Sequence, residues 1–119
     1  MYFSAMDKDP VATNPDHYRV VFENARVRVL EYRDESGHQS VPHAHPDSVM
    51  VTLSSFSRRL SSSDGRVFDA QLPIGKALWL PAQEHWGENT GTTPTHTIFV
   101  ELKEPSPAPD GEASPLGPR

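Results

Sequence analysis

Short runs of apolar residues alternate with polar ones along most of the chain, and clusters of glycine, proline and aspartate separate the runs. Alternation of this kind is typical of strands that bury one face, because successive side chains of a strand point to opposite sides. No segment has the period of about 3.6 residues that indicates an amphipathic helix. The pattern therefore predicts an all-β barrel or sandwich. Strands are expected over residues 20–22, 26–33, 49–53, 58–62, 66–72, 76–80, 85–89 and 95–102.

The two ends of the chain differ from this region. Residues 1–16 are polar and contain two prolines, and we interpret them as an N-terminal arm without structure of its own that folds over a neighbour. Residues 104–119 contain five prolines and two glycines, a composition that predicts a disordered tail. The β-barrel is accordingly expected over residues 17–103.

Composition narrows the classes of function. The chain has 119 residues, a formal net charge of −5 at pH 7 and no cysteine. This length suffices for one domain with a buried core. The negative charge argues against nucleic acid and acidic membrane surfaces as partners, because both are bound by basic faces. Without cysteine, a metal site needs histidine, carboxylate or amide ligands. No apolar run is long enough to span a membrane, and we expect a cytoplasmic protein.

The sequence His43-Ala44-His45 places two histidines one residue apart. In a strand both imidazoles project from the same face, about 7 Å apart along the strand. Two ring nitrogens on one face can converge on a single ion, and a histidine from another strand can complete the site. If Pro46-Asp47 adds no bulge, the same inward face continues through the next strand. Its odd-numbered residues are Val49, Val51 and Leu53.

A third histidine, His85, lies in a second informative stretch over residues 75–89. The two stretches together resemble the two motifs of the cupin superfamily. In the first motif a glycine is followed, after five residues, by His-x-His. In the second motif a glycine is followed, after five residues, by a proline and then by a histidine and an asparagine. The matching residues are Gly37, His43 and His45 in the first motif, and Gly75, Pro81, His85 and Asn89 in the second.

The resemblance covers residues 18–102 and implies a cupin-type double-stranded β-helix, a jelly-roll-like barrel of two antiparallel sheets. It also implies a divalent metal held by His43, His45 and His85, and a homodimer. More narrowly, the chain resembles small single-domain bacterial cupins linked to β-alanine degradation. The sequence segments on which this narrower resemblance rests are residues 22–30, 45–48 and 80–82.

Two positions depart from the cupin pattern. The glutamate of the first motif is absent, because Val49 and Met50 stand where it would fall, and Gln83 stands where the second motif has a glycine. The site then consists of three neutral histidines without a carboxylate. It is similar to the three-histidine cupins, which include Fe(II) dioxygenases, and it leaves several coordination positions for substrate and O₂. A metal-free descendant of a metal-binding cupin is the competing interpretation.

Three further polar residues are candidates for catalysis or substrate binding. Gln39 lies four residues before His43, so both side chains would point to the same face of one continuous strand. Gln39 could then be a fourth metal ligand or a hydrogen-bond donor to the substrate, and the alternative is an exposed residue. Glu84 adjoins His85 and is expected at the rim of the site or behind the ligands. His96 is a proton shuttle if it faces the cavity, although we favour a structural histidine.

Arg58 and Arg59 are adjacent, so a regular strand directs one of them inward. An inward arginine needs an anionic partner, such as the carboxylate of a substrate. The alternative, which we favour, is that both side chains extend outward at a sheet edge.

We therefore expect a metal-dependent enzyme that acts on a small organic substrate, with a dioxygenase that uses Fe(II) as the favoured form. With Zn(II), Ni(II) or Mn(II), the same site would act as a Lewis acid in isomerisation, cyclisation or elimination. A non-catalytic cupin that binds a small ligand is the third possibility. The sequence does not separate the three.

Overall fold

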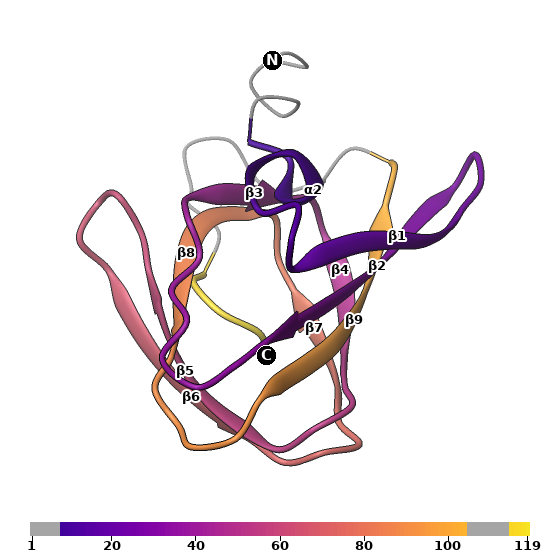
Figure 1. Ribbon diagram of the computed structural model, residues 1–119. Coiled ribbons are helices and arrows are strands. Elements are labelled where there is room, and N and C mark those ends of the chain that lie inside the picture. Colours follow the sequence, from indigo (N-terminus) through magenta and orange to yellow (C-terminus); the bar gives the residue numbers. More distant parts are fainter. Residues whose placement is uncertain (1–7, 105–114) are drawn as a thin grey trace.

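The structure, a computed structural model, describes residues 8–104 and 115–119. Within these residues nine strands form two antiparallel sheets that enclose an interior (Figure 1). This architecture confirms the predicted all-β fold. The elements are α2 (Pro10–Thr13), β1 (Tyr18–Glu23), β2 (Val27–Asp34), β3 (His43–His45), β4 (Ser48–Thr52), β5 (Phe56–Ser61), β6 (Val67–Leu72), β7 (Ala77–Leu80), β8 (Gln83–Asn89) and β9 (Thr95–Leu102).

The chain passes repeatedly from one sheet to the other. The larger sheet has the strand order β1-β2-β9-β4-β7, and the smaller one has the order β3-β8-β5-β6. In the larger sheet β9 pairs with β2 along its whole length and with β4 on its other side. In the smaller sheet β3 and β8 are neighbours although they are far apart in the sequence. This pairing brings the two histidine-containing stretches together.

The interior combines apolar and polar side chains. On β9 the buried residues alternate strictly, and Thr95, Thr97 and Glu101 share the inward face with Phe99. Buried polar groups are stable when they are hydrogen bonded, so this face supports a polar network beside the apolar core. The main cluster of the apolar core consists of Tyr18, Leu30, Tyr32, Met50, Leu80 and Phe99.

The inward face of β4 is opposite to the predicted one. Ser48, Met50 and Thr52 are buried, whereas Val49 lies on the other face and is half-buried. At Pro46-Asp47 the chain leaves the smaller sheet after β3 and enters the larger sheet at β4. The crossing changes the inward-facing residues from odd-numbered ones on β3 to even-numbered ones on β4. A shift of one residue moves every side chain of a strand to the opposite face.

The described part of the N-terminal arm has a structure of its own, contrary to prediction. Asp9 is the N-cap of helix α2 and also pairs with Arg28 on β2 at 2.7 Å. The carbonyl of Lys8 accepts a hydrogen bond from the backbone N–H of Ala44 on β3. These contacts hold this part of the arm against its own barrel, while residues 1–7 lie outside the described residues. No helix in the described part of the chain has the length and apolar character needed to cross a membrane.

Part of the predicted tail is also ordered. Residues 115–119 lie along the free edge of β7, where Trp79 and Arg119 exchange two backbone hydrogen bonds of 2.8 and 2.7 Å. In Figure 1 this yellow segment runs into the middle of the ring of strands. The prediction of disorder is therefore wrong for residues 115–119, because a sheet edge offers backbone partners that composition does not reveal. Residues 105–114 lie outside the described residues.

Candidate metal centre

The pairing of β3 with β8 gathers the three predicted metal ligands. His43 lies directly opposite His85, and His45 lies opposite Gln83. Residues that are paired across a ladder share a face, as do residues two apart on one strand. The three imidazoles are buried, their ring centroids lie 4.9 to 5.3 Å apart, and one nitrogen from each lies within 4.8 Å of the others.

Each of the three rings has its Nδ1 directed at an oxygen atom. A neutral imidazole has one N–H and one lone pair, so an Nδ1–H that donates to oxygen leaves the lone pair on Nε2. Such outer hydrogen bonds orient histidine ligands in metalloproteins. Three lone pairs therefore remain for one divalent ion. The acceptors are the carbonyl of Val41 for His43 (2.8 Å), Glu101 Oε2 for His45 (3.3 Å) and Gln83 Oε1 for His85 (2.7 Å).

Electrostatics keep two of these ligands uncharged. Burial, with a contribution from neighbouring His45, lowers the pKa of His43 to about 3. Burial, then the two other imidazoles and Arg58, lowers the pKa of His85 well below its ordinary value of 6.5. Metal binding requires neutral imidazole, so both rings are in the ligand form at neutral pH. The donor set of three buried imidazoles suits a divalent transition metal.

Tyr18 contacts this cluster, and the sequence analysis missed it. Its hydroxyl lies 3.4 Å from Nε2 of His43 and 3.3 Å from Nε2 of His45. Burial raises the pKa of Tyr18 well above its ordinary value of 10.0, so the phenol retains its proton. A lone tyrosine before an expected strand carries no motif, and only the pairing of β1 with β2 turns it inward.

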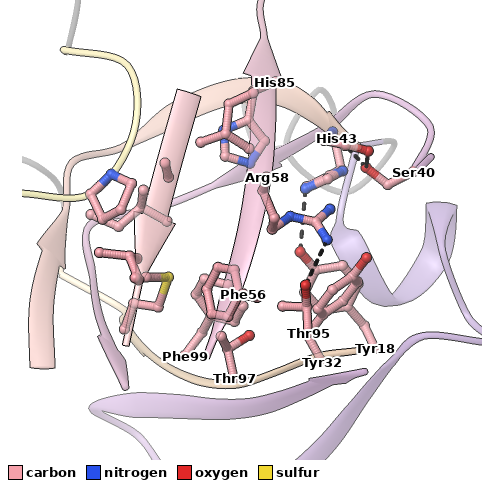
Figure 2. Close-up of a pocket in the computed structure, with 17 residues that line it drawn as sticks. Tyr18, Tyr32, Ser40, His43, Phe56, Arg58, His85, Thr95, Thr97 and Phe99 are labelled. Carbon is pink, nitrogen blue, oxygen red and sulfur yellow. Dashed lines mark hydrogen bonds between the residues drawn. The ribbon is translucent and has the colours of Figure 1, made fainter. Parts of the chain in front are cut away.

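Arg58 points into the barrel, and the favoured outward orientation is wrong for it. Its Nη1 donates to Asp34 Oδ2 at 2.5 Å and to Thr95 Oγ1 at 3.2 Å, and its guanidinium lies 5.1 Å from the ring centre of Tyr32. Figure 2 shows this guanidinium between the two histidines, His43 and His85, and the side chains of Tyr32 and Thr95. The anionic partner that an inward arginine needs is therefore Asp34, which the sequence analysis did not identify. Arg59 is exposed and pairs with Asp69.

The other predicted candidates lie away from the cluster. Gln39 is exposed and forms an isolated β-bridge with Glu88. Because β3 begins only at residue 43, the alternation of faces along β3 does not predict which way Gln39 points. Glu84 faces outward and pairs with Lys8 at 2.8 Å. His96 is on the outer face of β9, where Nε2 lies 2.6 Å from Glu31 Oε2. The cavity roles considered for Gln39 and His96 are therefore wrong.

A small cavity of about 50 Å³ adjoins the cluster (Figure 2). Apolar side chains, including Phe56, Leu80 and Phe99, form much of its wall together with Arg58. Thr97 also lines the cavity, and its buried hydroxyl has no hydrogen-bond partner among the described residues. A buried hydroxyl without a partner is costly, so Thr97 is a ready contact for a polar group of a bound molecule.

Replacing Glu101 with glutamine is expected to weaken metal binding by about tenfold, since the loss of an outer carboxylate costs about 10–100-fold in affinity. Glu101 Oε2 faces His45, and Glu101 Oε1 accepts a hydrogen bond from Arg28 Nε at 3.0 Å. Competition against a chelator, with Co(II) or Zn(II), measures the dissociation constant. Glu84→Gln is the matched control and should bind as tightly as wild type. Equal affinity in the Glu101 variant would contradict the assigned role.

Comparison with solved structures establishes the fold. A cupin domain from Bordetella pertussis Tohama I superposes with a TM-score of 0.67 and 28% identity, covering 73% of this chain and 92% of that one. A protein with a double-stranded β-helix domain from Klebsiella pneumoniae subsp. pneumoniae MGH 78578 gives a TM-score of 0.57 and 23% identity over 71% and 74%. An RmlC-like cupin from Methanocaldococcus jannaschii gives 0.57 and 11% identity over 71% and 77%.

No protein-family model and no curated protein matches the chain. The structural matches, together with the two antiparallel sheets, show a cupin fold, and the histidine cluster within it has the arrangement of a candidate site for a divalent metal.

Proposed function

We propose that this cupin-fold chain is a metal-dependent enzyme that acts on a small organic substrate, and that it is a dioxygenase using Fe(II). The observation that carries the proposal is the set of three buried imidazoles whose Nδ1 atoms face oxygen acceptors and which bring one nitrogen each within 4.8 Å of the others. Structural histidines do not need this shared arrangement, whereas ligands of one ion do.

The ligand set favours an anionic substrate, whichever divalent metal is bound. Three neutral imidazoles without a carboxylate leave the charge of a divalent ion unbalanced, which favours an anionic substrate in the remaining positions. Fe(II) in this set supplies one-electron chemistry with O₂, whereas Zn(II), Ni(II) or Mn(II) supplies Lewis acidity. Both chemistries require the substrate to reach the same face of the three histidines.

The side chains around the cavity have complementary roles in substrate binding. Arg58 lines the cavity, and its guanidinium is a hydrogen-bond donor for an anionic group of a substrate. The protonated hydroxyl of Tyr18 is a donor beside His43 and His45. The Thr97 hydroxyl is placed to form a hydrogen bond with a second polar group of the substrate, and the apolar side chains of the wall limit the access of water.

The substrate class included in this proposal is a small carboxylic acid. A carboxylate suits a divalent ion whose charge no ligand balances, and it can accept hydrogen bonds from a guanidinium such as that of Arg58. The narrower resemblance to bacterial cupins linked to β-alanine degradation is part of the same proposal. It directs the first tests to β-alanine and to its three-carbon oxidation products.

Oxygen uptake with defined metals tests this function. Metal-free protein is loaded anaerobically with Fe(II), Zn(II), Ni(II) or Mn(II) and then supplied with small carboxylic acids. We expect O₂ uptake in step with substrate loss for the Fe(II) form, and none for His45→Ala. Turnover without O₂, or equal turnover with Zn(II), would replace the dioxygenase by a non-oxidative enzyme. Binding without turnover for every metal would indicate a non-catalytic ligand-binding cupin.

A further inference from the structure

Residues 115–119, called the strap below, bridge the edges of the two sheets. The strap pairs with β7, the edge strand of the larger sheet, through the two backbone hydrogen bonds between Trp79 and Arg119. Its Gly117 is buried and packs against Phe68 on β6, the edge strand of the smaller sheet. The strap therefore spans the gap between β7 and β6 instead of extending into solvent.

The strap is also connected to a metal-ligand candidate through Gln83. The N–H of Gly117 donates to Gln83 Oε1 at 3.0 Å, and the same oxygen lies 2.7 Å from Nδ1 of His85. The amide nitrogen of Gln83 donates to the carbonyls of Pro81 and Pro115. All four contacts agree with one orientation of the Gln83 side-chain amide. The strap and the metal-ligand candidate His85 therefore share one acceptor, Oε1 of Gln83. Gln83 is the residue that stands in place of the family's glycine.

The cavity beside the cluster is too small for an organic substrate while the strap is in place. Pro118 is part of its wall, and the space inside is about 50 Å³. Ligand sites are typically about 300–1,000 Å³. A substrate that reaches the face of the histidines with Arg58 must therefore displace part of the wall.

We propose that the strap is a displaceable plug of the substrate cavity: it closes the barrel in the resting state and leaves when substrate enters. This inference rests on the proposed function, because it takes the cavity beside the histidines as the substrate site. The strap is suited to release because few interactions with the described residues hold it: two backbone hydrogen bonds to β7, two to one glutamine, and the contact of a glycine with one aromatic ring.

Gly117→Ala is expected to release the plug. Gly117 has a φ of +86°, and an added Cβ would lie 2.5 Å from a ring carbon of Phe68. Strain and overlap together should raise the exchange rate of the Trp79 amide hydrogen by about tenfold or more, because this amide bonds to the strap. Gly65→Ala is the matched control: its φ is +90°, but an added Cβ meets no atom within 4 Å. Its Trp79 amide should exchange as in wild type.

A disulfide lock tests the opposite state. Residues 79 and 119 exchange both backbone hydrogen bonds, which places their Cα atoms about 5.5 Å apart, within the range of disulfides. The chain has no cysteine, so W79C/R119C forms a single defined bridge. The probe is acetohydroxamate, a small bidentate metal ligand, and its binding to the Co(II)-loaded protein is followed by visible absorption. The oxidised form should exclude the probe, and reduction should restore binding.

The two measurements separate this inference from the proposed function. Probe binding needs a bound metal but no turnover, so a protein that lacks oxygenase activity still tests the plug. If Co(II) does not bind, hydrogen exchange of the Trp79 amide in the metal-free protein is the measurement that tests the plug. Exchange of the Trp79 amide that is equally fast in wild type and Gly117→Ala would overturn the inference. Equal probe binding by the oxidised and reduced double variant would overturn it as well.

Discussion

Replacing Arg58 with methionine is expected to destabilise the protein by about 3–5 kcal/mol, the cost of leaving one charge of a buried ion pair without its partner. The side chain of Asp34 is fully buried and that of Arg58 is 11% exposed. Burial alone would raise the pKa of Asp34, but Arg58 and the hydrogen bonds from Tyr32 and Asn89 hold it below its ordinary value of 3.8. Without Arg58 a buried carboxylate lacks its counter-charge. Urea unfolding at neutral pH measures the change in the free energy of unfolding.

The adjacent arginine provides the control for this prediction. Arg59 pairs with Asp69 at 2.8 Å, but both side chains are exposed, and exposed ion pairs contribute little to stability because water screens them. Arg59→Met should therefore unfold close to wild type. Adding Asp34→Asn to the Arg58 variant removes the unpaired charge and should recover part of the loss. Equal stability of the Arg58 and Arg59 variants would contradict the assignment of a buried pair.

Replacing His85 with alanine should weaken metal binding more than about a hundredfold, because the loss of an outer contact alone costs about 10–100-fold. His85 supplies one of three gathered nitrogens and lies opposite His43 in the ladder. The measurement is metal content, element by element, of untagged protein after dialysis, together with competition against a chelator.

His96→Ala is the control for the His85 variant. His96 lies on the outer face of β9, where it is hydrogen bonded to Glu31 of β2, and it does not belong to the histidine cluster. Its removal should leave the metal content unchanged. Retention of metal by the His85 variant, or its loss from the His96 variant, would mean that the ion is held elsewhere.

Features that depend on residues close together in the sequence were predictable. Alternation within each segment predicted the strands, since the buried face of a strand shows as a period of two. His43 and His45 were expected to share a face for the same reason, and the structure places both inward on β3. The third histidine came from its resemblance to the second cupin motif. The structure brings it opposite His43, while metal binding itself stays a prediction.

Features that depend on packing across the barrel were not predictable. His96 alternates in register with the apolar residues Ile98 and Val100, which would suggest an inward position, but on β9 the inward face includes Thr97 and Glu101. The usual association of apolar residues with the interior fails there, because this interior surrounds a polar site. A charged residue that alternates with threonines was a signal that could have identified Glu101.

The order of the strap is a second example of a tertiary effect. Proline and glycine usually prevent a packed element. In residues 115–119 the glycine fits because it has no side chain where Phe68 lies, and because its φ is positive. Its partners, β7, Gln83 and Phe68, lie far from it in the sequence. Composition alone contains no information about them.

The central claim is that one divalent ion is held by the three histidines of β3 and β8. The most direct test is a crystal structure of untagged protein loaded with Fe(II) or Co(II), with diffraction measured at the absorption edge of that metal. We predict one anomalous peak about 2.1 Å from Nε2 of His43, His45 and His85, with each Nδ1 still bonded to its present acceptor. A peak at another place, or no peak while the His85 ring points away from the other two, would contradict the account.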